Sequence, residues 1–223
     1  MNPAGPYNMY TYFIGANPVT SFNPVSYYPL IDPSSYLSPF SYIVGKVFIR
    51  KNVFIGPFVS IRADEGTPFF IGSDSNLQDG VILHGLKQKY VTVQNKRFSI
   101  FIGKRVTCAH GSLIHGPVYI GHDTFVGFNA IVYNAKVEEG CFISSGAVVT
   151  NGVTLKANRF VPPGASIDSQ DKADSLKSVP KSSEEFAKDV QRVNREFPPS
   201  YSLFFGETRC SCGLYTGLEF VTS

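Results

Sequence analysis

The sequence predicts an all-β solenoid: a left-handed parallel β-helix built from six-residue repeats, with a C-terminal α-helix packed on it. Three observations support this fold class. An aliphatic residue returns at about every sixth position, glycine often follows it directly, and an amphipathic helical pattern comes after the last repeat. The repeated positions, one of them a cysteine, are Ile43, Ile49, Ile55, Ile61, Ile71, Leu77, Leu83, Ile102, Cys108, Ile114, Ile120, Val126, Val132, Val137, Ile143, Val149, Leu155, Val161 and Ile167.

A period of six matches neither common pattern, because an amphipathic helix needs about 3.6 residues per turn and a half-buried strand alternates every two. Six residues make one short strand and one turn, and such units stack into a parallel β-helix in which each coil is buried by its neighbours. With three flat sides, a coil takes about 18 residues. The alternative, ordinary strands with chance spacing, is disfavoured because the phase persists, with the step from Val132 to Val137 one residue short.

The chain divides into four segments. Residues 1–40 are an irregular, Pro- and Tyr-rich lead-in, residues 41–168 form the β-helix, residues 169–197 are a polar linker and a helix, and residues 198–223 are an irregular tail. Ser182 and Glu185 form a capping-box pattern at the start of the helix. One helix face, which we expect to pack on the solenoid, carries Phe186, Val190, Val193 and Phe197.

The bulk composition is that of a globular protein. Of 223 residues, 43% are hydrophobic and 17% are charged. A net charge of +3 gives no reason to expect a nucleic-acid or membrane-surface partner, and no apolar run is long enough for a transmembrane helix. Met1–Tyr10 lacks the pattern of a signal peptide, and four cysteines do not form a disulfide framework. We therefore expect a cytoplasmic protein.

The repeat phase predicts that two histidines lie side by side on the surface. His84 follows Leu83 and His115 follows Ile114, and a residue next to an inward-pointing one points outward. After an insertion near residues 86–101, the count returns Ile114 to the face of Leu83. The two histidines are then stacked on adjacent coils, about 4.7–4.9 Å apart, and can share one metal ion.

The same count predicts two columns of side chains on either side of one corner. The first column is Arg62, His84, His115 and Tyr133, and the second is Asp79, His110 and Phe128. His110 cannot close on the histidine pair of its own chain, but it can do so in a neighbouring chain. The same docking brings Arg62 of one chain toward Asp79 of another, and a closed ring of three chains satisfies both pairings.

Simpler readings of these residues exist. A surface histidine is usually plain polar surface, as we expect for His122 in its turn, and Arg62 and Asp79 could be unrelated charges. Cys108 and Cys141 fall at or near inward positions and are expected in the core. Cys210 and Cys212 could bind a metal or be redox-active, but a mobile tail is favoured.

At these residues the chain resembles the γ-class carbonic anhydrases. The matching stretches are residues 61–66 (IRADEG), 76–80 (NLQDG), 83–84 (LH) and 109–117 (AHGSLIHGP), with further likeness at 17–20 (NPVT) and 169–174 (SQDKAD). The likeness spans about residues 15–195 and extends to the N-terminal domain of a carboxysome assembly protein of the same family. An arginine, a glutamine-aspartate pair and three histidines at these spacings form a specific combination.

This resemblance implies a homotrimer of left-handed β-helices that hydrates carbon dioxide to bicarbonate with a metal-bound hydroxide at its subunit interfaces. The metal, zinc or ferrous iron, would sit on His84 and His115 of one chain and His110 of the next. Arg62 and Asp79 match the family's intersubunit ion pair. Further matches by resemblance are Gln78 to the residue that orients the hydroxide, Glu65 to a proton-transfer glutamate, and Asn194 to an asparagine that lines the carbon dioxide site.

The chain also departs from the family. The loop after His84 is short and basic, with no acidic residue before His110, and Arg192 replaces a tyrosine common before the helix asparagine. A homologue that keeps the metal site as a bicarbonate- or carbon dioxide-binding scaffold with little or no turnover is therefore an alternative. Glu65 itself could be a simple turn residue. An acyltransferase is disfavoured, because it needs one catalytic histidine and a coenzyme A groove.

Overall fold

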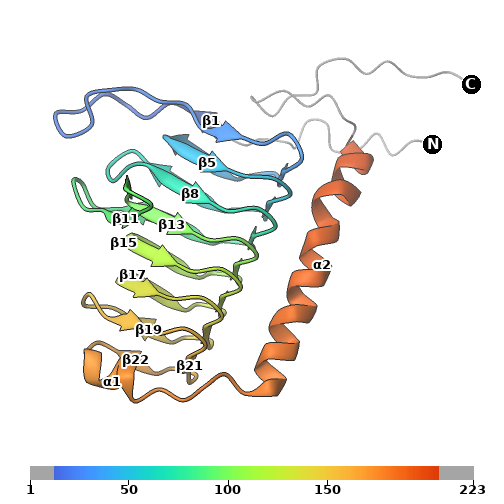
Figure 1. The fold of residues 1–223 in the computed structure, drawn as a ribbon. Coiled ribbons are helices and arrows are strands. Elements are labelled where there is room, and N and C mark those ends of the chain that lie inside the picture. Colours follow the sequence, from blue (N-terminus) through green and yellow to red (C-terminus); the bar gives the residue numbers. More distant parts are fainter. Residues whose placement is uncertain (1–12, 206–223) are drawn as a thin grey trace, which may run out of the picture.

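The computed structural model describes residues 13–205 and shows a parallel β-solenoid, a left-handed β-helix with a helix along its side (Figure 1). A bent 13-stranded sheet forms two of its three faces. The first face contains β1 (Phe13–Gly15), β4 (Tyr42–Gly45), β7 (Ser60–Ala63), β10 (Ile82–Gly85), β19 (Val148–Val149) and β22 (Ser166–Ile167). The second contains β2 (Leu30–Ile31), β5 (Val47–Ile49), β8 (Phe69–Ile71), β13 (Ile100–Ile102) and β20 (Thr154–Leu155). Two long strands, β15 (Leu113–Ile120) and β17 (Ile131–Val137), pass from the first face to the second.

A separate seven-stranded sheet forms the third face. Its strands are β3 (Tyr36–Leu37), β6 (Phe54–Ile55), β9 (Asn76–Leu77), β14 (Thr107–Cys108), β16 (Phe125–Val126), β18 (Phe142–Ile143) and β21 (Phe160–Val161). An antiparallel hairpin, β11 (Val91–Val93) and β12 (Lys96–Phe98), projects from the coil that carries β13. The predicted insertion near residues 86–101 is thus confirmed.

The interior confirms the predicted repeat phase. Every repeated position from Ile43 to Ile167 is at most 4% exposed. The short step from Val132 to Val137 matches an irregularity in the pairing of β15 with β17, after His115. Because each inward side chain rests on those of the adjacent coils, the core is one continuous stack.

The first coil starts earlier than the sequence analysis expected. The lead-in of residues 1–40 was expected to be irregular, yet β1, β2 and β3 lie within it and pair with β4, β5 and β6. Ile31 and Leu37 continue the six-residue series back from Ile43 and pair with Ile49 and Ile55, so the repeat count could have found β2 and β3. Only β1 breaks the series, because a long loop separates it from β2. The loop is held by Asn17, which is 2% exposed and whose side chain bonds the backbone of Val25 and Tyr27.

Two helices follow the solenoid. The short α1 (Gln170–Asp174) closes the last coil, and α2 (Lys181–Phe205) runs back along the seven-stranded sheet toward the first coil (Figure 1). The chain between residues 198 and 205 was expected to be irregular, but α2 continues through Pro198 and Pro199. Stacking of Tyr201 on Tyr36, with ring centroids 4.8 Å apart, anchors that last part of the helix.

Two details of the predicted helix were wrong. α2 begins at Lys181, so Ser182 lies inside the first turn and is not the N-cap; the amides of Ser183 and Glu184 bond instead to the carbonyl of Pro180. Val193 is 48% exposed and leaves the packed face, while Asn194 is buried there. A pattern based on hydrophobic residues alone cannot predict a polar residue on the packed face.

Two of the four cysteines lie within the described residues. Cys108 and Cys141 are buried, and burial raises the pKa of their thiols to about 12 and about 11, so both stay protonated near neutral pH. Cys210 and Cys212 lie outside the described residues. Within residues 13–205, no helix has the length and apolar character to cross a membrane.

Truncating one inward side chain should destabilise the whole solenoid. Leu155 is fully buried, and Leu155→Ala should lower the free energy of unfolding by about 2–5 kcal/mol because it leaves a cavity. Leu30→Ala makes the same chemical change at a side chain that is 64% exposed, and it should cost far less. Denaturant unfolding of both variants measures the difference; equal losses would contradict the assigned phase.

Candidate metal and catalytic site

The two predicted neighbours, His84 and His115, face each other on adjacent strands. Strands β10 and β15 pair in parallel with His84 opposite His115. Nδ1 of His84 lies 3.2 Å from Nε2 of His115. The register also places Arg62 beside His84 and Tyr133 beside His115, so the first predicted column is confirmed.

This nitrogen pair fits a bound cation. Two nitrogens on one tetrahedral ion, each about 2.0–2.1 Å from it, are about 3.3–3.4 Å apart. Nδ1 of His115 lies 3.2 Å from the carbonyl oxygen of Gly116, and a proton on Nδ1 would leave the lone pair of Nε2 toward His84. Two facing lone pairs repel unless a proton or a cation lies between them.

The surroundings of His84 favour its neutral form. Burial lowers the pKa of the imidazole below its usual value, and the nearby charge of Arg62 lowers it further. Among residues 13–205, neither the buried Nε2 atom nor the buried Oδ1 of Asp64, which lies 3.5 Å from it, has a hydrogen-bond partner. A neutral imidazole with a carboxylate behind it is the usual arrangement of a metal-binding histidine.

A turn after β7 brings two carboxylates to His84. Glu65 Oε2 lies 3.8 Å from His84 Nε2, and Glu65 Oε1 accepts a hydrogen bond of 3.2 Å from the backbone amide of Lys87. Gly66 lets the turn approach closely, because a Cβ there would lie 2.6 Å from the carbonyl carbon of Gly85. Strand β10 and the start of the hairpin therefore position Glu65.

Arg62 pairs within its own chain. Its Nε donates to Oδ2 of Asp64 at 3.0 Å. The predicted contact of Arg62 with Asp79 of another chain stays a prediction. Sequence reasoning gave Asp64 no role, because Asp64 follows the end of β7 and lies in a turn whose shape the repeat does not specify.

His110 lies across the corner from the histidine pair, in the turn after β14. Its Nδ1 lies 3.5 Å from Oδ2 of Asp79, and its ring stacks on Phe128 at 5.8 Å, which confirms the second predicted column. The side chain is about half exposed. Gly111 completes the turn with φ near +71°, a conformation that favours glycine. Within residues 13–205 of one chain, no three His, Cys, Asp or Glu side chains are grouped to hold a metal ion.

The amide side chains of the predicted site differ in their surroundings. Gln78 follows β9, is 7% exposed, and donates from Nε2 to Oδ1 of Asn76 at 3.2 Å. Asn194 is also 7% exposed, but its Nδ2 donates to the carbonyl of Val190 within α2 at 2.9 Å. Its contribution to the site stays a prediction. His122 lies elsewhere, where its Nδ1 accepts from the backbone amide of Lys104.

Comparison with known proteins identifies the family. No family model matches the chain. Over 176 residues, however, it is 40% identical to the carbonic anhydrase of Methanosarcina thermophila, covering 74% of this chain and 71% of that protein. The chain belongs to the γ-class carbonic anhydrase family. It is also 42% identical over 181 residues to the carboxysome assembly protein CcmM of a Nostoc species, covering 81% of this chain but 32% of that protein.

Solved structures agree on the fold. A hexapeptide transferase family protein from Anaplasma phagocytophilum matches 84% of this chain and 98% of its own, with a TM-score of 0.65 and 22% identity. A putative acetyltransferase from Bacillus cereus matches 79% of this chain and 92% of its own, with the same TM-score and identity. At this identity the likeness supports the hexapeptide-repeat β-helix and carries nothing about activity.

Single histidine substitutions should separate ligands from bystanders. We expect His84→Ala and His115→Ala each to lose stoichiometric zinc, whereas His122→Ala, outside the site, should keep it. Elemental analysis after equilibrium dialysis measures the metal, and circular dichroism checks the fold. Stoichiometric zinc retained in folded His84→Ala protein would exclude the site as described.

Proposed function

We propose that the chain is a metal-dependent carbonic anhydrase whose active sites lie between the subunits of a homotrimer. The facing ring nitrogens of His84 and His115 carry this proposal, because they would supply two ligands of a three-histidine site and no third metal-binding side chain of residues 13–205 is grouped with them in the same chain. His110 of a neighbouring chain would supply that donor. Ile82, Phe128 and Tyr133, exposed by 43%, 39% and 38%, lie close to the histidines in the fold and would be covered by the neighbour.

Three neutral imidazoles suit zinc and can also hold ferrous iron. A divalent metal held there supplies a Lewis acid that lowers the pKa of a coordinated water, to about 7 in the carbonic anhydrases for which that value is known. Asp64 would hold the Nε2–H tautomer of His84, and the Gly116 carbonyl would hold the Nδ1–H tautomer of His115.

Gln78 would orient the nucleophile, and Glu65 would accept its proton. Because Nε2 of Gln78 is used by Asn76, its Oε1 is left as an acceptor that can hold the hydrogen of the nucleophile and direct a lone pair at carbon dioxide. Glu65 Oε2, next to His84, would take the proton that each turnover must export. The backbone amide of Lys87 holds the other oxygen of this carboxylate.

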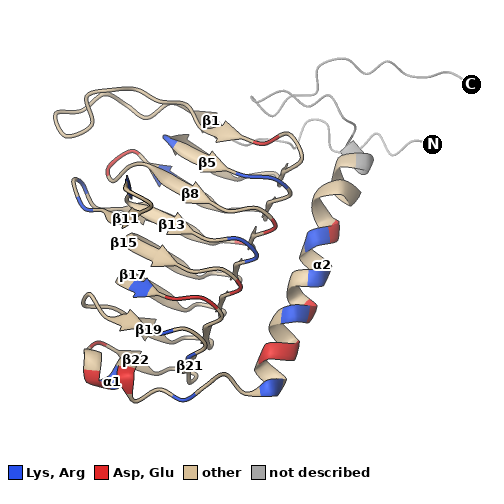
Figure 2. Cartoon of the chain, viewed as in Figure 1, with Lys and Arg blue, Asp and Glu red and all other residues tan. Residues whose placement is uncertain are grey.

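A second function, a scaffold that binds bicarbonate without fast turnover, is favoured by the charge of the hairpin. Lys87, Lys89, Lys96 and Arg97 lie on the hairpin segment, and no acidic residue occurs between His84 and His110 (Figure 2). Nothing acidic on this segment could relay a proton away from Glu65. The likeness to a carboxysome assembly protein points the same way.

Stopped-flow carbon dioxide hydration by protein of known metal content, loaded anaerobically with zinc or ferrous iron, tests the proposal. We expect metal-dependent turnover that falls by about a hundredfold or more in Gln78→Ala, because the nucleophile loses its orienting acceptor. Gln88→Ala, on the hairpin, is the matched control. Full metal occupancy without turnover in either form would favour the scaffold function.

The shared site can be tested by mixing two defective chains. His84→Ala and His110→Ala chains should each fail to bind stoichiometric zinc alone. Refolded together in equal amounts, they should recover about a quarter of the wild-type zinc, because each mixed ring of three contains one intact interface. No recovery in mixed trimers confirmed by native mass spectrometry would argue against a site shared between chains.

Glu65→Gln should slow turnover mainly by removing the proton acceptor. We expect the rate in dilute buffer to fall about tenfold or more, with metal content unchanged, and to recover as imidazole buffer is raised. Glu139→Gln, on a distant turn, should behave as wild type. A rate unaffected by Glu65→Gln at low buffer would assign this residue to the turn alone.

A further inference from the structure

The face of the solenoid that lies under α2 is aromatic except at two coils, where it is polar. One outward side chain of each strand in the seven-stranded sheet points to the helix, and these residues pair in one continuous register. In order they are Tyr36, Phe54, Asn76, Thr107, Phe125, Phe142 and Phe160. All are aromatic except Asn76 and Thr107, which are each 1% exposed. These two belong to the coils that carry Gln78 and His110.

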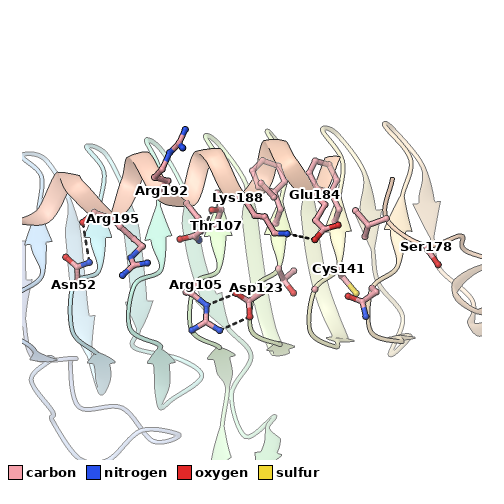
Figure 3. Close-up of a pocket in the computed structure, with 18 of the residues that line it drawn as sticks. Asn52, Arg105, Thr107, Asp123, Cys141, Ser178, Glu184, Lys188, Arg192 and Arg195 are labelled. Carbon is pink, nitrogen blue, oxygen red and sulfur yellow. Dashed lines mark hydrogen bonds and ion pairs between the residues drawn. The ribbon is translucent and has the colours of Figure 1, made fainter. Parts of the chain in front are cut away.

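The side chains of α2 that face the solenoid are also aromatic on either side of these two coils and polar opposite them. Phe186 packs on Phe125 with ring centroids 5.5 Å apart, and Phe197 packs on Phe54 at 5.1 Å. Between them, Gln191 donates from Nε2 to the hydroxyl of Thr107 at 3.0 Å. Figure 3 shows Thr107 beneath α2, in the groove of about 840 Å³ between helix and solenoid.

Three hydrogen bonds connect the helix to Gln78. Gln191 Nε2 and Asn76 Nδ2 each donate to Oγ1 of Thr107 at 3.0 Å. Asn76 therefore turns its Oδ1 toward Gln78, which donates to it from Nε2. A threonine hydroxyl can accept two hydrogen bonds, so these two donors fill its acceptor capacity. They thereby fix the direction of the hydrogen-bond series that runs from Gln191 to Gln78. Among the hydrogen bonds of residues 13–205, none involves the Oε1 atom of Gln78, which is left as an acceptor.

A purely structural role explains this arrangement poorly. Aromatic residues fill the same position in the other five strands of the sheet, and burying polar groups costs free energy unless every hydrogen bond is made. The Oε1 atom of Gln191 is buried and has no hydrogen-bond partner among residues 13–205, and such an unsatisfied group costs free energy.

We propose that Thr107 and Gln191 are positioning residues that hold the amide of Gln78 with its oxygen toward the active site. The inference rests on the proposed function of Gln78 and extends it to α2. Neither residue needs to touch the substrate, because each acts through Asn76.

The test pairs kinetics with isosteric substitutions. Thr107→Val and Gln191→Leu should lower kcat about tenfold while KM and zinc content stay near wild type, and Thr107→Ser should restore the rate because it keeps the hydroxyl. Thr124→Val is the control: Thr124 is 2% exposed and its hydroxyl bonds only backbone carbonyls, of His122 and Glu138, among the described contacts. An equal loss in Thr124→Val would overturn the proposal.

A second readout does not depend on turnover. The chain has five glutamines, so side-chain nitrogen labelling gives a simple NMR spectrum in which Gln78 can be assigned by substitution. We expect the Gln78 amide protons to exchange slowly in wild type and at least about tenfold faster in Thr107→Val and Gln191→Leu. Unchanged exchange in both variants would overturn the inference. Wild-type protein without hydration activity would instead overturn the proposed function, while the exchange result would still decide whether α2 orients Gln78.

Discussion

The inward side chains of each coil are buried by the coils on either side of it, and the arrangement of the outward side chains on the strands follows from that constraint. An inward side chain every six residues sets the rotation of the chain around the solenoid axis. Neighbouring residues alternate in direction, so the inward phase also determines which residues point out and which of them stack. His84 and His115 are adjacent in space, although 31 residues apart, because Leu83 and Ile114 occupy equivalent inward positions.

This coupling explains how much could be predicted from sequence. The columns of Arg62, His84 and His115 and of Asp79 and His110 follow from counting, and the register of the strands agrees. Counting fails where the contacts are not periodic. The first coil is interrupted by a long loop, and the contact of Arg62 with Asp64 depends on a turn whose shape no repeat specifies. The proposed third ligand, His110, would come from a neighbouring chain, and the structure of one chain does not show how chains assemble.

The helix was the least predictable element. A hydrophobic pattern placed Val193 on the packed face, whereas the structure buries Asn194 and bonds Gln191 to Thr107. The helix faces a surface that is aromatic at both ends and polar in the middle, so its own pattern is mixed. Only knowledge of which strand residues lie opposite makes that pattern intelligible. Phe197 and Tyr201, on either side of the two prolines near its end, pack on Phe54 and Tyr36 of the first coils.

The path of α2 also bears on how the molecule comes apart. A stack of coils with nearest-neighbour contacts alone can fray from either end, one unit at a time. Here a single helix touches strands from β18 to β3, so the terminal coils are tied to the middle of the stack. Loss of an end coil requires part of the helix to detach, and detaching it exposes aromatic surface on several coils at once. The helix thus couples the coils, so that the stack is expected to unfold as one cooperative unit.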